Sequence, residues 1–307
     1  MNSRAAILIC TKDRPVYLER TLNCILNSKL TNVGEILVVD GSTDEGTKLL
    51  CQQLSTNNQL IKINWIHTDG GKPTALNLGF KQLQAFELIH CLDDDITIPE
   101  EYFKVLEQFF FEHLEIVGVA PLIKNRSLPT QHSVNNKNAG RITKYGINYW
   151  FNEFQDAPDF QYSEWLPGGA CSYRSSVLQK VIASNVLHNP NVNYALGDDV
   201  DLSLQASKAG LLACVTSLEV IHEEAPSLTS SSKILEMDIA RANWKIYLWR
   251  HHPERISLTR VLTWDFFSGI YHILKRDQHM TSVRLFKYFR ALSKAAWSRT
   301  RNFRSST

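Results

Sequence analysis

The sequence has no run of apolar residues long enough to cross a bilayer. The opening run, Ala5–Cys10, ends close to charged residues and is too short for a signal peptide. The longest later run, Leu262–Leu274, is interrupted by Asp265 and His272. We therefore expect no membrane-spanning segment and no cleaved leader.

Cysteine is scarce as well. Six cysteines occur in 307 residues, no two form a Cys-x-x-Cys pair, and most sit inside apolar runs. This pattern argues against a disulfide scaffold and against a zinc site. We expect buried thiols in a reducing cytoplasm at Cys10, Cys24, Cys51, Cys91, Cys171 and Cys214.

Neither sign of charge is in marked excess. The chain has 33 Lys or Arg against 31 Asp or Glu, so no strong overall field attracts nucleic acid, and we expect no nucleic-acid partner. The segment from Lys275 to Arg304 is an exception, because it has nine Lys or Arg and a single acid, Asp277.

Short apolar runs alternate with longer amphipathic segments over the first hundred residues. This alternation predicts a mostly parallel sheet covered by helices on both faces, which is an α/β fold. Strands are predicted at Ala5–Cys10, Glu35–Val39, Ile61–Ile66 and Leu88–Leu92, and helices at Val16–Ser28, Gly46–Leu54 and Thr74–Phe86.

The pattern is less regular afterwards, and residues 122–165 show no clear period. Almost everything from Ser230 onward is predicted to be helical. We expect a catalytic domain over 1–222, made of a half at 1–95 and a half at 96–222, and a helical C-terminal region over 223–307. Within the second half, helices are predicted at Pro99–Phe111 and Ser175–Ala183, and strands at Ile116–Pro121, Leu211–Val215 and Leu218–His222.

Polar clusters follow the carboxyl end of each strand predicted in the first hundred residues. They begin at Thr11, Asp40, Asp69 and Asp93. The carboxyl ends of parallel strands lie along one edge of a sheet, and ligands bind in the crevice there. We therefore expect the four clusters to converge on one site.

Asp93-Asp94-Asp95 is the sharpest of these clusters. Three consecutive carboxylates repel one another unless a cation or a basic partner offsets their charge. A divalent ion such as Mg²⁺ or Mn²⁺, held by one or two carboxylates and by phosphate oxygens, fits that need. A solvated, acidic helix start capped by Asp95 or Thr97 is the alternative. The triplet directly follows an apolar strand at the expected ligand edge, which favours the metal site.

A second acidic group, Asp198-Asp199, opens a predicted helix. Aspartate is common in the first turn of a helix, where it complements the helix dipole. A catalytic cleft also needs a carboxylate that takes the proton from an incoming hydroxyl. One of the two can face the cleft while its neighbour points elsewhere.

Three further positions have an ordinary alternative. Lys72 is either an exposed loop lysine or a cation that faces a pyrophosphate at a helix N-terminus. Gly168-Gly169 allows the backbone to approach a ligand closely, or only makes a tight turn. His222, just past an apolar β pattern, either completes a metal site or is an ordinary surface or core histidine.

Taken in order, these segments resemble the motifs of the family 2 glycosyltransferases, inverting enzymes with the nucleotide-sugar transferase A (GT-A) fold. The resemblance spans residues 5 to about 222 and implies a GT-A fold with a helical C-terminal appendage. It also implies a divalent metal cofactor, a nucleotide-sugar donor and a glycan or lipid-linked glycan acceptor. The matching segments are 11–15 (TKDRP), 38–42 (VVDGS), 71–79 (GKPTALNLG), 92–95 (LDDD), 166–170 (LPGGA) and 197–202 (GDDVDL).

The resemblance also implies roles for single residues. Asp199 matches the catalytic base, although Asp198 stands where the family has Glu. Asp40 would hold the nucleoside near the base, and Lys72 would meet the base or the phosphates. In the Asp-x-Asp motif, Asp93 would lie near the ribose. Asp95 would bind the metal, for which His222 is the second candidate ligand. The remaining candidates for donor binding are Thr11, Arg14, Ser42, Asp94 and Gly169.

Two rival functions have discriminating features. A sugar-phosphate nucleotidyltransferase should have a Gly-rich loop after the first strand, and the segment Cys10–Pro15 contains no glycine. An inactive glycan-binding protein on the same fold has no need of both acidic groups. The Gln-x-x-Arg-Trp motif of processive members is also missing, since Arg241-Ala-Asn-Trp244 matches it only in part. We therefore expect transfer of one sugar per encounter.

The basic C-terminal segment predicts an amphipathic helix over Ser282–Arg304. Its apolar stripe contains Leu285, Phe289 and Leu292, with Arg and Lys on the opposite side. Such a helix suits docking on an anionic membrane surface, peripherally at the inner face of the membrane. A surface helix that packs its stripe on the protein is an equal alternative.

Overall fold

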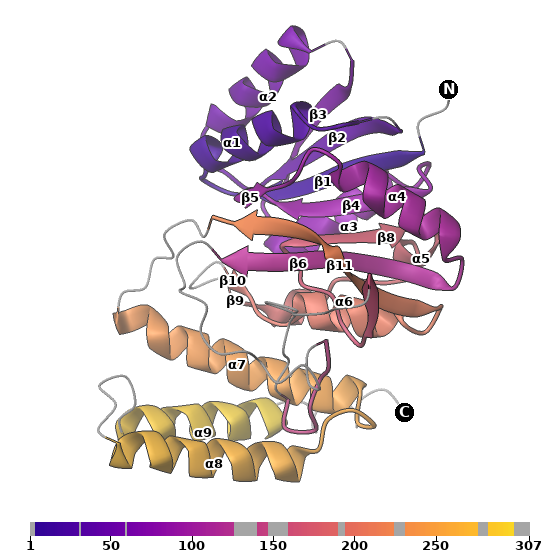
Figure 1. Cartoon of the computed structure of the whole chain (residues 1–307). Helices are drawn as coiled ribbons and strands as arrows, with labels where there is room; N and C mark the ends of the chain where they lie inside the picture. Colours follow the sequence, from indigo (N-terminus) through magenta and orange to yellow (C-terminus); the bar gives the residue numbers. More distant parts are fainter. Residues whose placement is uncertain are drawn as a thin grey trace, which may run out of the picture. The chain divides into compact units, whose positions relative to one another are not determined.

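The computed structural model describes residues 4–30, 32–58, 60–125, 140–146, 159–189, 194–223, 231–275 and 282–297 (Figure 1). The chain divides into two compact units, each built from more than one stretch of sequence. The first unit consists of Met1–Arg141, Tyr149–Asn185 and Asp198–Ser227, and the second of Ile142–Asn148, Val186–Gly197 and Leu228–Thr307.

A nine-stranded sheet forms the centre of the first unit, in the order β3-β2-β1-β4-β8-β6-β11-β5, with β7 paired to β11. Strands β3, β2, β1 and β4 are parallel, as the sequence predicts, and β6 is parallel to β11. The bounds are β1 (Ala5–Thr11), β2 (Val33–Asp40), β3 (Lys62–His67), β4 (Leu88–Asp93), β5 (Ile96–Thr97), β6 (Ile116–Asn125), β7 (Phe160–Ser163), β8 (Ala170–Arg174) and β11 (Leu211–His222).

Helices cover both faces of this sheet because successive strand side chains point to opposite sides. Ile7 and Ile9 of β1 share a buried cluster with α1 (Pro15–Leu26) and α4 (Tyr102–Glu112). Leu8 of β1 belongs to a second cluster with α3 (Lys72–Gln82) and α6 (Asp198–Ala206). The first unit is therefore a layered α/β structure. It also contains α2 (Gly46–Asn57), which packs against β3, and the single turn α5 (Ser175–Leu178).

Three details of the first unit differ from the sequence predictions. The helix predicted over Ser175–Ala183 is only the turn α5, and Ala170–Arg174 just before it forms the unpredicted strand β8. The irregular region contains the unpredicted strand β7. The two last predicted strands are one strand, β11, whose pairing with β6 shifts register between Val215 and Glu219. The register shift lies at the polar residues between the two predicted strands, so that a single strand continues past them.

The second unit contains the helices α7 (Ser231–His251), α8 (Leu258–Leu274) and α9 (Ser282–Trp297), and the short antiparallel pair β9 (His188–Asn189) and β10 (Tyr194–Ala195). A 3-10 turn, Asn185–Leu187, precedes β9. A buried ion pair joins two of the helices, since Lys245 Nζ lies 2.6 Å from Asp265 Oδ1. Tyr288 of α9 donates a hydrogen bond of 2.5 Å to the other oxygen of Asp265. Charge and hydrogen bonding therefore hold the three helices together.

The apolar stripe of α9 packs within the second unit, which is the alternative that the sequence leaves open beside membrane docking. Leu292 is buried with Ala242 and Ile246 of α7. Arg284, one of the basic residues placed on the side opposite the stripe, forms an ion pair with the buried Asp238. The stripe packs inward because a helix bundle needs that apolar area for its own core. The segment after Trp297 lies outside the described residues.

All six cysteines are free thiols, and four of them are buried. Among the described residues, no helix is both long and apolar enough to span a membrane.

Candidate active site

Polar side chains of the first unit meet at the edge where β1, β2 and β4 end. Strand β8 runs antiparallel to β4, so that its beginning lies beside the end of β4. The backbone N–H of Asp93 donates a hydrogen bond of 2.9 Å to the carbonyl oxygen of Gly169. This pairing brings the Gly168-Gly169 turn up to the acidic triplet, although the two are far apart in sequence.

Each member of the triplet has a cationic neighbour. Lys72 Nζ lies 2.8 Å from Asp93 Oδ1. Arg14 lies 2.6 Å from Asp94 Oδ1 and 3.3 Å from Asp95 Oδ2. The sequence predicts that a metal ion offsets the negative charge of the triplet. In the structure, basic side chains of the protein already offset part of this charge.

Asp94 has no exposed surface, unlike Asp93, the first residue of the triplet. Thr11 Oγ1 donates a hydrogen bond of 2.5 Å to Asp94 Oδ2, and Arg14 pairs with the other oxygen. Burial raises the pKa of Asp94 to about 6, although Arg14 and Thr11 act in the opposite direction. These contacts tie β1 to β4. Direct donor binding by Thr11, Arg14 and Asp94 stays a prediction.

A possible metal site is formed by Asp93, Asp95 and His222. One ligand atom from each lies within 4.8 Å of the other two, and His222 Nε2 is 3.0 Å from Asp95 Oδ1. His222 reaches this place because the end of β11 pairs with β5, which follows the triplet directly. Two carboxylates and an imidazole suit Mn²⁺, because carboxylate oxygens bind Mg²⁺ and Mn²⁺ while imidazole nitrogen favours transition metals.

Asp199, in the first turn of α6, has no such cationic contact in the described part of the chain. Its carboxylate accepts hydrogen bonds from the backbone N–H groups of Gly168, at 3.2 Å, and of Val200, at 2.8 Å. Burial and the neighbouring charge of Asp198 raise the pKa of Asp199 to about 7, against these two hydrogen bonds and the charge of Lys72. A carboxylate with this pKa can accept a proton near neutral pH.

Lys72 lies between the triplet and α6, at the start of α3. A side chain at Gly168 would bring its Cβ to 3.6 Å from Lys72 Nζ and to 3.3 Å from Asp199 Cβ. Burial alone would lower the pKa of Lys72, but Asp93 and Asp198 outweigh it and raise this pKa well above its usual value. Lys72 is therefore a fixed positive charge at a site lined by glycine backbone. The sequence points to Gly169 as a donor-binding residue. In the structure the neighbouring Gly168 also belongs to the site, because its backbone N–H donates a hydrogen bond to Asp199.

Asp40 and Ser42 form a buried network at the end of β2. Asp40 Oδ1 accepts hydrogen bonds from Ser42 N at 2.8 Å and from Ser42 Oγ at 2.5 Å. Trp65 Nε1 donates to Asp40 Oδ2 at 3.1 Å, and Ser42 Oγ accepts from the N–H of Asp13. Asp40 has no exposed surface in this arrangement. The network fixes the loop after β2, and a direct nucleoside contact by Asp40 or Ser42 stays a prediction.

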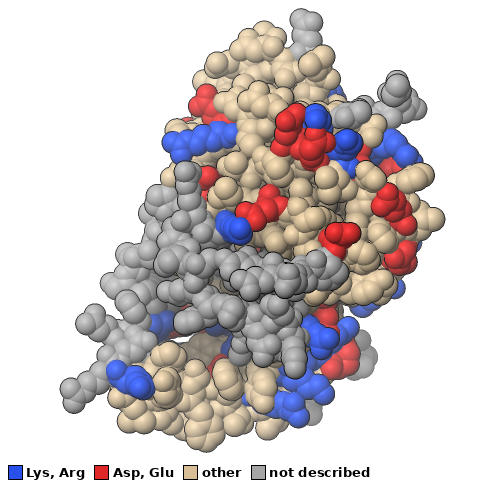
Figure 2. All heavy atoms as spheres, in the orientation of Figure 1, with Lys and Arg blue, Asp and Glu red and all other residues tan. Residues whose placement is uncertain are grey.

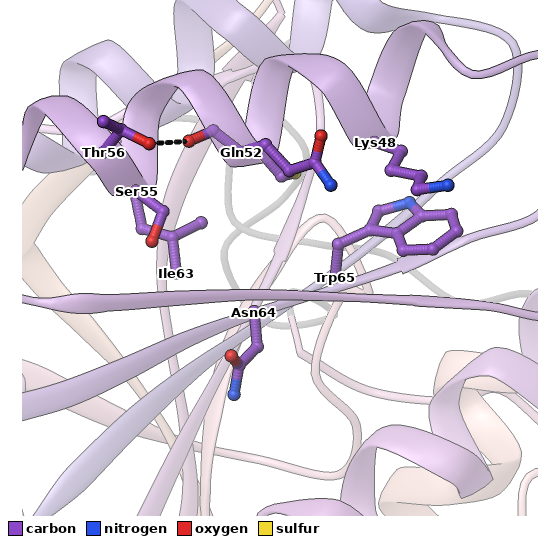
Figure 3. A pocket seen from close by; sticks show the side chains of 8 residues that line it. Lys48, Gln52, Ser55, Thr56, Ile63, Asn64 and Trp65 are labelled. Atoms are coloured by element: carbon purple, nitrogen blue, oxygen red, sulfur yellow. Dashed lines mark hydrogen bonds between the residues drawn. The ribbon is translucent and has the colours of Figure 1, made fainter.

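Trp65 also lines a hollow between α2 and β3 (Figure 3). In this view Lys48 lies beside the Trp65 ring, with its Nζ 5.5 Å from the ring centroid. None of Asp93, Asp95 and His222 lines the hollow. Sequence reasoning missed Trp65, because an indole in a strand has the pattern of an ordinary core residue.

Gly197 is constrained both by its backbone conformation and by its surroundings. Its φ of +76° is a conformation that favours glycine, and it directly precedes Asp198. A Cβ at this position would lie only 1.8 Å from Nε1 of Trp244, a buried side chain of α7 in the same unit. The chain can therefore enter the acidic turn only because residue 197 has no side chain.

The sequence profile described as "Glycosyl transferase family 2" matches residues 6–181. These residues contain the triplet, Lys72 and the Gly168-Gly169 turn. The chain belongs to glycosyl transferase family 2. A search of curated proteins finds no match to this glycosyltransferase.

Solved structures resemble this glycosyltransferase in fold. GalNAc-T7, crystallised with UDP, GalNAc and Mn²⁺, has 15% sequence identity and a TM-score of 0.61 over 83% of this chain, which spans only 51% of GalNAc-T7. The mannosyltransferase PcManGT from Pyrobaculum calidifontis, in complex with GDP-Man and Mn²⁺, has 11% identity and a TM-score of 0.59, covering 97% of this chain and 88% of PcManGT.

A third structure, S. aureus TarS 1-349 in complex with UDP-GlcNAc, has 15% identity and a TM-score of 0.51. The match covers all of this chain and 93% of the TarS chain. At these identities the likeness establishes the GT-A fold.

Proposed function

We propose that this glycosyltransferase uses a divalent metal, most suitably Mn²⁺, to transfer one sugar from a nucleoside-diphosphate sugar to an acceptor hydroxyl with inversion. The observation that carries the proposal is the placing of two different acidic sites around one glycine turn. Gly169 adjoins Asp93 of the ion-paired triplet, and Gly168 holds the proton-accepting Asp199.

The metal would be held by Asp93, Asp95 and His222. When bound, it supplies a Lewis acid that offsets the negative charge of a departing diphosphate. Lys72 adds a positive charge at the start of α3, where the first backbone N–H groups of the helix also favour phosphate oxygens. UDP is our first choice of nucleotide, and dTDP or GDP are the alternatives. Donor contacts are assigned to Thr11, Arg14, Asp40, Ser42, Lys72, Asp93, Asp94 and Gly169.

Asp199 would act as the general base. It accepts the proton of the acceptor hydroxyl as the oxygen attacks the anomeric carbon of the donor. Because attack comes from the face opposite the leaving diphosphate, the anomeric configuration inverts. The backbone N–H of Gly168 holds one carboxylate oxygen in place while the acceptor approaches. Holding both reactants in line can lower the barrier by roughly 7 kcal/mol or more.

For the acceptor, we propose a glycan or a lipid-linked glycan in surface-polysaccharide assembly. The place of action we propose is the cytoplasm, with the enzyme attached peripherally to the inner face of the membrane. The cation-rich composition of the C-terminal segment supports such attachment.

The deciding experiment is a panel of UDP-, GDP- and dTDP-sugars tested with Mn²⁺, Mg²⁺ or EDTA. Donor hydrolysis and the thermal shift are both measured. We expect one donor class to be hydrolysed and to stabilise the protein with Mn²⁺ but not with EDTA. Asp95→Asn is the control and should lose both responses. A donor that binds equally well with EDTA would contradict the proposed metal role, and no response to any donor would contradict the donor class.

A further inference from the structure

Helix α8 has a row of large apolar side chains on its outward side. Trp264, Phe267, Tyr271 and Leu274 are 47%, 64%, 57% and 78% exposed. Their spacing of three, four and three residues puts them on one side of the helix. Exposed single apolar residues are ordinary, but a contiguous row on one helix indicates an interaction surface.

Most of this row lies outside the buried core of the second unit, although the Trp264 ring centroid is 5.3 Å from that of Tyr145. Helix α8 packs through the opposite side, which contains Val261, Asp265 and Gly269 at intervals of four residues. Val261 and Gly269 are buried, and Asp265 pairs with Lys245. Gly269 allows Leu285 of α9 to come so close that a Cβ there would lie 2.3 Å from Leu285 Cδ1. Helix α8 docks in its bundle mainly through this inner side and through Phe266, whose ring meets that of Phe289 on α9. Most of the outward row stays exposed to solvent.

Cations border the row. Exposed Arg260 and Lys275 lie near its two ends, and Lys275 Nζ is 5.8 Å from the Tyr271 ring centroid. Exposed Lys287 and Arg290 follow on α9. The one acid of α8, Asp265, is turned inward. In Figure 2 the lower region, where Figure 1 draws α8 and α9, is mostly uncharged, with Lys and Arg at both ends and Asp or Glu beside them at the right.

We propose that the α8 surface, defined as Arg260, Trp264, Phe267, Tyr271, Leu274 and Lys275, docks into the interfacial region of an anionic lipid bilayer. This inference extends the membrane attachment proposed above and moves it from the stripe of α9 to the outward side of α8. Trp and Tyr favour the boundary between headgroups and acyl chains, and neighbouring cations are attracted to anionic headgroups.

Charge also argues against a second copy of the chain as the occupant. A two-fold symmetric pairing through this surface would place the same cations of two copies near each other, and like charges across an interface weaken it. An anionic bilayer instead offers the opposite charge and an apolar layer together. The chemistry of the α8 surface therefore matches the bilayer on both counts.

The test is flotation of the full chain with vesicles of phosphatidylcholine alone or with added phosphatidylglycerol, at rising salt. We expect binding to the anionic vesicles that weakens with salt. Phe267→Gln should lower the partition coefficient by about ten-fold, as expected for the loss of one buried aromatic side chain. The triple change Trp264→Gln, Phe267→Gln, Tyr271→Gln should abolish binding. Donor hydrolysis measured without vesicles should be unchanged in these variants. This readout separates a failure of membrane docking from a failure of the proposed function.

Phe111→Gln is the matched control. Phe111 is 75% exposed on α4 of the first unit, so the same substitution there removes a similar side chain away from α8. This control should bind vesicles as the wild type does. The proposal is overturned if the wild type does not bind anionic vesicles at low salt, or if the triple variant binds as well as the control. It is also overturned if light scattering shows a dimer that only the α8 variants dissociate, without vesicle binding.

Discussion

The two acidic groups of the first unit contain the same residue type and are chemically different. Asp93, Asp94 and Asp95 each meet Lys72 or Arg14, and their charge is offset by these side chains. Asp199 accepts hydrogen bonds from backbone N–H groups, and burial together with the charge of Asp198 raises its pKa to about 7. Environment rather than composition thus separates carboxylates suited to a cation from one suited to a proton.

The difference also shows what a cation does at this edge of the sheet. Lys72 contacts Asp93 but acts on Asp199 only through its charge, which lowers the pKa of Asp199. The two acidic groups are therefore electrostatically linked through one lysine. Variants on either side should reveal whether the two roles are separable.

The largest expected effect is from Asp199→Asn. Transfer should fall by roughly 10² to 10⁴-fold, because the proton acceptor is lost. Donor affinity should be retained, because the triplet and Lys72 are untouched. Turnover and calorimetric titration with the donor found in the panel measure the two properties separately. A parallel loss of donor affinity would move Asp199 into the donor site and remove the contrast between the two groups.

Asp95→Ala should have the opposite profile. Metal-dependent donor binding should weaken by more than the roughly 10 to 100-fold that loss of an outer partner of a metal ligand costs. Manganese titration followed by electron paramagnetic resonance measures metal binding without turnover, and His222→Ala should resemble Asp95→Ala. If both variants bound manganese as tightly as the wild type, the negative charge of the triplet would be offset by Lys72 and Arg14 alone.

Gly197→Ala should disturb the acidic turn while leaving the triplet alone. A methyl group must displace the Trp244 indole or change the positive φ, and we expect a loss of about 1–3 kcal/mol in the free energy of unfolding. Denaturant unfolding measures this. Measured in the Trp244→Ala background, Gly197→Ala should cost less than in the wild type if the clash is the cause, whereas an unchanged cost would point to the backbone conformation.

The smallest effect is on pH dependence. The pKa of Asp199, about 7, predicts that turnover falls as pH drops through 7, where the base becomes protonated. Asp198→Asn removes a charge that raises this pKa, so the fall in turnover should move to lower pH. A pH profile of turnover at saturating donor measures the shift. An unchanged profile would assign the proton acceptor to another group.

Stability provides an independent check on the same pKa. The folded-state pKa of Asp199 is above its ordinary value, so the folded state binds the proton more tightly than the unfolded state. The contribution of Asp199 to stability is full below pH 4 and is lost as pH rises towards 7. Asp199→Asn should therefore be more stable than the wild type at pH 8, and the difference should shrink as pH falls. Urea unfolding at both pH values measures it.

The parts of the fold that could be predicted are those with a local signal. Buried parallel strands are continuous apolar runs, and the polar residue after each run marks the ligand edge, as at Asp40 and Asp93. Strand β8 has no such signal, because its residues Ala170–Arg174 are small or polar and its place is set by pairing with β4 and β6. Tertiary pairing, which a single sequence does not display, decided this element.

The same limit applies to the candidate site. Asp199 and the triplet were identified because acidic clusters at the ends of elements are conspicuous. The hydrogen bond from Gly168 to Asp199 and that from Trp65 to Asp40 join residues 31 and 25 positions apart, and neither leaves a local pattern. The apolar stripe predicted on α9 is present in the structure, but the sequence did not show that it packs on α7.

The position of His222 along the chain has a consequence for synthesis and folding. It lies 127 residues after Asp95 and at the end of β11, a strand held by β6 and β5. A growing chain therefore completes both carboxylates of the proposed metal site long before the imidazole emerges. Contacts so distant in sequence form late and slowly. During refolding from denaturant, tight manganese binding should thus appear after most of the helix signal has returned, and the ion would report the closing of the sheet.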